Sequence, residues 1–191
     1  MQRKKVECVK TKIKEAIKHS PIPEDPIHSE NTLRWVLKLK PDASISLQLA
    51  ALGHDIERAY PPRIRREDYR DYDSFKKAHA ERSAQIMSKL LKTCGIEGDV
   101  HNEIVELVRR HETGGDKTSD ILNYADSLSF FEVNLPMYFK RNGETEARKR
   151  FLWGLKRLPH ELIEAVRELR YKDETLQALA EKWLAEFKHT K

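Results

Sequence analysis

The sequence predicts an all-α protein, and three observations support this prediction. Apolar residues recur at spacings of three and four through almost every segment, which is the period of an amphipathic helix. No segment shows a convincing alternation of apolar and polar residues, as a half-buried strand would. Proline or glycine marks most gaps between the periodic segments. Because 191 residues fit one domain, we expect residues 1–191 to fold as a single domain.

Each periodic segment is interpreted as one helix. The predicted helices cover residues 3–18, 28–39, 43–58, 73–92, 97–111, 118–140, 144–157, 159–170 and 173–188. The first is basic and has a narrow apolar stripe formed by Val9, Ile13 and Ile17. Residues 59–72 form a proline-interrupted loop rich in Arg and Tyr. This loop could be a solvated surface loop or a lid over an anionic substrate.

Composition narrows the class of protein. The chain has 36 basic and 31 acidic residues, a net charge of +5 that favours anionic ligands. Because both signs are interspersed, this excess does not by itself indicate nucleic acid. No apolar run approaches 18 residues and the N-terminus lacks an apolar signal region, so we expect a cytoplasmic protein without a membrane span. Cys8 and Cys94 form no CxxC motif, and we expect no disulfide framework from them.

Several histidines and aspartates fall on the apolar faces of the predicted helices. These inward-facing residues are His28, His54, Asp55, His79, His111 and Asp126. A buried carboxylate is costly unless a cation or several hydrogen-bond donors meet it. One or two divalent metal ions would satisfy all six side chains. A ligand set of imidazole and carboxylate suits Mn, Fe, Co, Ni or Zn.

The order of these six residues resembles the HD superfamily of metal-dependent phosphohydrolases, in which a helical bundle gathers a His, a His-Asp doublet and a distant Asp. Residues 51–58, ALGHDIER, resemble the doublet motif, and residues 124–128, YADSL, resemble the terminal Asp motif. The resemblance covers about 28–140 and implies an HD-domain-like helical bundle. Helix 3–18 and the C-terminal helices of 144–188 would pack on it. The run from Pro41 to His79 looks closest to an uncharacterised subgroup.

The resemblance implies hydrolysis of a phosphoester, in a nucleotide or another small phosphorylated metabolite, through a metal-bound hydroxide. Several nucleotide-cleaving relatives carry Glu three residues after the doublet Asp, where this chain has Arg58. We therefore expect Asp55 and Arg58 to act in catalysis, with Arg58 binding phosphate or else pairing with a helix carboxylate. Arg82, three residues after His79, is a further catalytic and substrate-binding candidate, and Lys76 is a substrate-binding candidate.

Three alternatives remain open at this stage. The six-ligand pattern also resembles the di-iron oxygenases of the superfamily. The domain could instead bind a nucleotide as a sensor without turnover. Nucleic-acid binding by helix 3–18 and the Arg-rich loop is the weakest alternative, because no recognised motif supports it. The sequence does not decide between a monomer and a homodimer.

Overall fold

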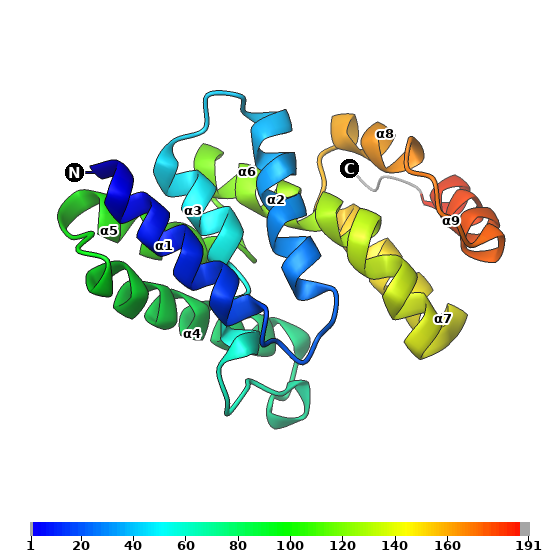
Figure 1. Ribbon diagram of the computed structural model, residues 1–191. Helices are drawn as coiled ribbons and strands as arrows, with labels where there is room; N and C mark the ends of the chain where they lie inside the picture. The colour runs from blue at the N-terminus through cyan, green and yellow to red at the C-terminus, as the bar shows by residue number, and fades with distance from the viewer. Residues whose placement is uncertain (1, 188–191) are drawn as a thin grey trace. The chain divides into compact units, whose positions relative to one another are not determined.

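The computed structural model describes residues 2–187, and every regular element in that range is helical (Figure 1), as the sequence predicts. The fold class is therefore all-α. The chain divides into two compact units, the first ending at Ala125 and the second beginning at Asp126. The predicted packing of the C-terminal helices on the core remains a prediction, and residue 188 of the last predicted helix lies outside the described range.

The first unit contains the helices that hold most of the candidate residues. Their bounds are α1 (Gln2–Ile17), α2 (Asp25–Leu39), α3 (Ile45–Gly53), η1 (Ile56–Ala59), η2 (Arg66–Asp68), α4 (Tyr72–Thr93), α5 (Gly98–Arg110) and the first part of α6 (Lys117–Ser129). Helix α3 packs against α2 and α5, and α4 packs against α5. Helix α1 lies along α3 and α4 (Figure 1).

Helix α3 is central because it is almost entirely buried. Its interior residues Leu47, Leu49 and Leu52 have at most 1% of their surface exposed. A helix that is apolar around its whole circumference must be covered on all sides, and α1, α2 and α5 provide that cover. The predicted stripe of α1, formed by Val9, Ile13 and Ile17, is also buried, as expected.

A disulfide bond joins Cys8 of α1 to Cys94 at the end of α4, so the expectation of no disulfide was wrong. The two cysteines are 86 residues apart in sequence, and no local pattern could show that they meet. They meet because α1 lies along α4, which brings their Cα atoms to 5.8 Å. The linkage therefore fastens the N-terminal helix to the unit.

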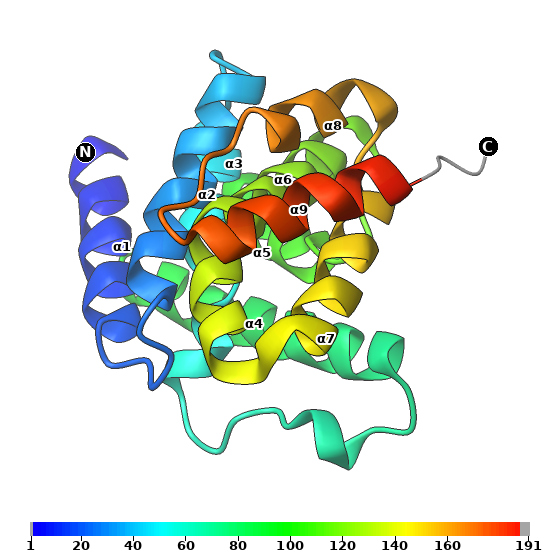
Figure 2. The same cartoon turned by 90° about the vertical axis from the view of Figure 1, so that its right-hand side faces the viewer.

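The second unit contains the end of α6, the π-helical turn η3 (Phe130–Asn134), α7 (Leu135–Lys156), α8 (His160–Arg167) and α9 (Glu174–Glu186). An aromatic cluster forms its core, with the ring of Phe151 5.0 Å from that of Phe131 and 5.3 Å from that of Trp183. Figure 2 shows α7 and α9 in this part of the chain. The predicted boundary near Asn142-Gly143 is confirmed as a kink between two helical segments of α7, where Gly143 has a non-helical φ of 74°.

No helix within residues 2–187 is long and apolar enough to cross a membrane.

Candidate metal centre

The His54-Asp55 doublet lies in a turn rather than inside a helix. Helix α3 ends at Gly53, and η1 begins at Ile56, so the predicted uninterrupted helix over 43–58 was wrong. Gly53 also lets this turn approach α4 closely, since a Cβ at that position would collide with the side chain of Met87. The chain therefore changes from an α-helix to a 3-10 helix at the doublet, where Asp55 has a φ of −99° and a ψ of 14°.

The imidazoles of His54 and His111 are held in equivalent ways. Nδ1 of His54 donates to the carbonyl of Ala51 at 2.8 Å, and Nδ1 of His111 donates to the carbonyl of Val108 at 2.7 Å. Each histidine is the residue that follows the last residue of its helix, α3 or α5. A carbonyl acceptor on Nδ1 fixes the tautomer in which Nε2 carries a lone pair. Both rings can therefore ligate a cation through Nε2.

Four buried imidazoles form a continuous cluster around Asp55. The ring centroids of His28 and His54 are 5.1 Å apart, those of His54 and His111 are also 5.1 Å apart, and those of His79 and His111 are 5.7 Å apart. All four side chains have at most 3% of their surface exposed. The structure thus brings together the four histidines that the sequence analysis selected, from four different parts of the first unit.

The two oxygens of Asp55 face different members of this cluster. Oδ2 lies 3.6 Å from Nε2 of His28 and 3.5 Å from Nε2 of His54. Oδ1 lies 2.7 Å from Nε2 of His79 and 3.8 Å from Nε2 of His111. Asp55 consequently belongs to two sets of donor atoms, each compact enough for one metal ion. We call these the first group (His28, His54, Asp55) and the second group (Asp55, His79, His111, Glu112).

Glu112 is a candidate ligand that the sequence analysis missed. Its Oε1 lies 3.2 Å from Nε2 of His111, and its carboxylate also pairs with Lys76. The signal that could have revealed it is the His111-Glu112 doublet, which follows the end of α5 as His54-Asp55 follows the end of α3. Both doublets place an imidazole and a carboxylate side by side where a helix stops.

His79 is oriented by a second carboxylate. Its Nδ1 donates to Oε2 of Glu57 at 2.8 Å, while its Nε2 faces Asp55. Glu57 is buried and is itself held by the backbone N–H of Ile64, which donates to Oε1 at 2.6 Å. Such a carboxylate behind a histidine fixes the ring and increases its basicity toward a metal. Burial lowers the pKa of His79, but its hydrogen bonds to Asp55 and Glu57 outweigh burial and raise it.

Arg58 forms an ion pair with Asp55 and with Asp25, the latter at 3.0 Å. Burial alone would raise the pKa of Asp55, but Arg58, His54 and His79 together hold it well below its usual range. Asp55 is therefore an anion, as a metal ligand must be. Burial lowers the pKa of His111 more than the neighbouring Glu112 raises it. The lowered pKa favours the neutral imidazole of His111. Of the two interpretations of Arg58, the structure shows the carboxylate pair, and phosphate binding remains a prediction.

The three remaining predicted site residues, Lys76, Arg82 and Asp126, belong to neither group. Lys76 contacts the second group through Glu112. Arg82 donates to the carbonyl of Tyr60 at 3.4 Å and is not a member of either group, so its catalytic role stays a prediction. Asp126 belongs to the second unit, where it pairs with Arg157 at 3.1 Å, and its assignment as a metal ligand also stays a prediction.

The donor atoms fit a divalent transition metal. The first group offers two imidazole nitrogens and a carboxylate oxygen, and the second offers two of each. Mixed nitrogen and oxygen sets of this kind suit Zn, Fe, Mn, Co or Ni.

Comparison with known proteins identifies the family of the chain but does not identify an activity. No curated protein and no solved structure matches the chain. Residues 9–179 match the model of a family described as a domain of unknown function, DUF4202. This match extends over far more than half of the 191 residues and includes both groups of candidate ligands. The chain therefore belongs to the DUF4202 family, whose function is unknown.

Proposed function

We propose that this protein is a metal-dependent phosphohydrolase that acts on a nucleotide or another small phosphorylated metabolite. The observation that carries the proposal is the position of Asp55 between two sets of ligands. A carboxylate that faces two such sets is suited to bridge a pair of divalent ions. Paired ions, typically about 3.5–4 Å apart, are a common arrangement in enzymes that hydrolyse phosphoesters.

A divalent ion in such a centre lowers the pKa of bound water toward neutrality and neutralises phosphate oxygens. The protein contributes the geometry. His54 and His111 present Nε2 because their Nδ1 atoms are tied to backbone carbonyls. Asp55 remains an anion beside Arg58. Glu57 holds the ring of His79 in place. These contacts set the ligand positions before any metal binds, which reduces the reorganisation that binding requires.

Two cations beside the ligands support an anionic substrate. The Arg58 side chain keeps 25% of its surface exposed and that of Lys76 keeps 14%. Each is paired with a candidate ligand, Asp55 or Glu112. A phosphate group bound beside Asp55 or Glu112 would therefore also lie beside one of these two cations. Positive charge directed at the developing negative charge of a phosphoryl transition state is an effective source of catalysis.

The test combines metal analysis with an activity screen. Protein purified without added metal is analysed for bound ions, and the loaded protein is assayed against nucleotides and sugar phosphates. We expect up to two equivalents of metal and release of inorganic phosphate or of a nucleotide. His54→Ala should abolish activity. His101→Ala is the matched control, because His101 lies on α5 but binds Ser88 and belongs to neither group.

Three results would contradict the proposal. Protein that carries no metal and cannot be loaded would remove its basis. A protein that binds iron, consumes oxygen with an organic substrate and cleaves no phosphoester would instead be a di-iron oxygenase, which the nitrogen-rich donor set also fits. Tight nucleotide binding to a fully loaded centre without turnover would indicate a sensor.

A further inference from the structure

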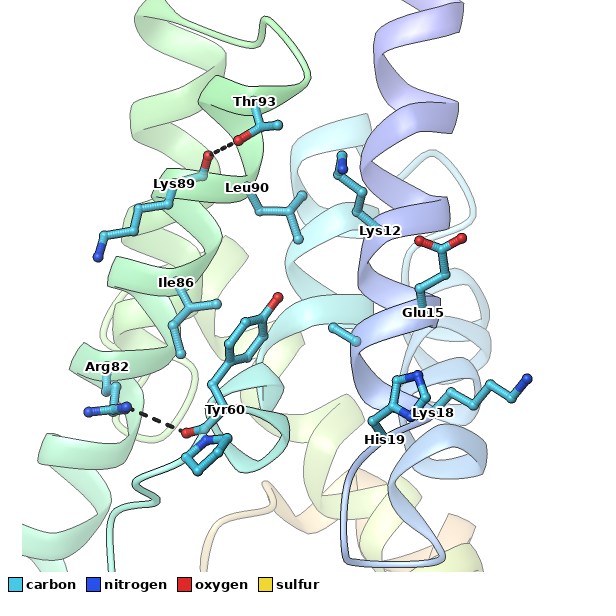
Figure 3. Close-up of a pocket in the computed structure, with 12 residues that line it drawn as sticks. Lys12, Glu15, Lys18, His19, Tyr60, Arg82, Ile86, Lys89, Leu90 and Thr93 are labelled. Carbon is cyan, nitrogen blue, oxygen red and sulfur yellow. Dashed lines mark hydrogen bonds between the residues drawn. The ribbon is translucent and has the colours of Figure 1, made fainter.

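A second site lies in the first unit, in a groove between α1 and α4 (Figure 3). The groove has a volume of about 900 Å³ and is closed at its base by the segment that follows η1. None of the ligands in the two metal groups contributes to its lining. We infer that this groove binds a nucleoside polyphosphate at a site separate from the metal centre.

The charge of the lining favours a polyanion. Four basic side chains line the groove, against the single acidic residue Glu15. They are Lys12 from α1, Lys18 just beyond the end of α1, and Arg82 and Lys89 from α4. Lys12 projects from α1 beside the groove, whereas the ammonium group of Lys89 points outward in Figure 3. Because a lysine side chain is long and flexible, Lys89 can turn toward a bound anion. A groove with such an excess of positive charge concentrates phosphate-bearing ligands.

At least one hydrogen-bond donor of Arg82 is unused within residues 2–187. Arg82 donates from Nη2 to the carbonyl of Tyr60 at 3.4 Å, and its buried Nε has no hydrogen-bond partner among residues 2–187. A guanidinium group presents five donors in a fork that matches the oxygens of a phosphate. Buried donors without a partner are uncommon and call for an explanation. A phosphate group in the groove would accept hydrogen bonds from the donors of Arg82 that remain exposed.

The apolar part of the groove favours a ligand with an aromatic ring. Ile86 and Leu90 form its α4 wall, and the ring of Tyr60 stands between that wall and α1 (Figure 3). Tyr60 keeps 39% of its surface exposed, which is high for a large apolar ring. A nucleobase would stack on this ring and cover it, with its phosphates toward the basic rim. Long single strands of nucleic acid usually bind to successive aromatic platforms, whereas one ring suits one base.

The test measures ATP binding by calorimetry on metal-free protein, which isolates this groove from the metal centre. We expect Lys12→Glu combined with Lys89→Glu to weaken ATP binding at least about tenfold. The matched control is Lys4→Glu combined with Lys92→Glu, which changes the net charge equally on the same two helices outside the groove. The control should change affinity less than about twofold. Arg82→Gln should weaken binding as well, and thermal melting should confirm that each variant folds.

Two comparison ligands test the assignment. Inorganic triphosphate should bind about 5–150-fold more weakly than ATP, the range that stacking of one base on one aromatic ring provides. A single-stranded RNA oligonucleotide should not bind more tightly than ATP.

Lack of ATP binding, equal losses in the groove and control variants, or equal affinity for inorganic triphosphate would overturn the inference. Tight RNA binding that the groove variants abolish would assign the groove to nucleic acid instead. All of these results are independent of whether the metal centre hydrolyses phosphoesters.

Discussion

Replacing Asp55 with Asn should remove both metal ions, whereas replacing a ligand of one group should remove one. Asp55 supplies a donor atom to each group, so its loss reduces the first group to two donor atoms and the second to three, and removes the charge that they share. His28→Ala affects only the first group, and His111→Ala affects only the second. The expected metal content is therefore two equivalents in the unmodified protein, one in each histidine variant and almost none in Asp55→Asn.

The asparagine variant should remain folded. Removing one partner of a buried ion pair can cost about 3–5 kcal/mol, because the other charge is left uncompensated. Here Arg58 keeps Asp25 at 3.0 Å, and we expect a smaller loss. Mass spectrometry after dialysis measures the metal content of each variant, and circular dichroism tests whether the variant is folded. Two retained equivalents in Asp55→Asn, or complete metal loss in His28→Ala, would refute the shared-ligand geometry.

Three further predictions concern stability and ligand orientation. Replacing Cys8 and Cys94 with serine should lower the free energy of unfolding by up to about 4.6 kcal/mol, the chain-entropy value for the 86-residue separation. Urea unfolding measures this loss, and a loss of free energy below about 1 kcal/mol would contradict a stabilising crosslink. Glu57→Gln should weaken metal binding at the second group about 10–100-fold, because Glu57 orients the ring of His79. Equal weakening of both groups in a metal titration would contradict this prediction. Because the folded-state pKa of Asp55 is lowered, its ionisation stabilises the metal-free protein above the unfolded pKa of about 3.9. That stability should be lost as the pH falls from about 4 through the lower folded-state pKa, and acid titration of Asp55→Asn should show a flatter decline.

The sequence was sufficient for the fold class and for the histidine cluster, because both depend on periodicity. A residue in line with the apolar positions of a helix faces the interior wherever that helix packs. This reasoning placed His79 and His111 in the interior, and both are buried in the structure. It needed no knowledge of how the helices are arranged, only that each has one apolar side.

Features that depend on helix ends or on distant contacts could not be predicted in this way. Apolar residues continue past Gly53 to Ile56, so periodicity gives no sign that α3 stops before the doublet. Glu112 lies in residues 109–115, RRHETGG, whose composition is typical of a solvated loop. The pairing of Cys8 with Cys94 depends entirely on the position of α1 along α4.

The ends of two helices bring four of the ligands together. His54 and His111 each follow the last residue of their helix, with backbone angles that are still helical. Nδ1 of each ring donates to a carbonyl three residues earlier, which leaves Nε2 beside Asp55. The next residue of each doublet, Asp55 or Glu112, supplies a carboxylate beside that ring. Placing both doublets at helix ends therefore supplies four donor atoms from two short turns. His28 and His79, which lie within α2 and α4, complete the two groups from the sides.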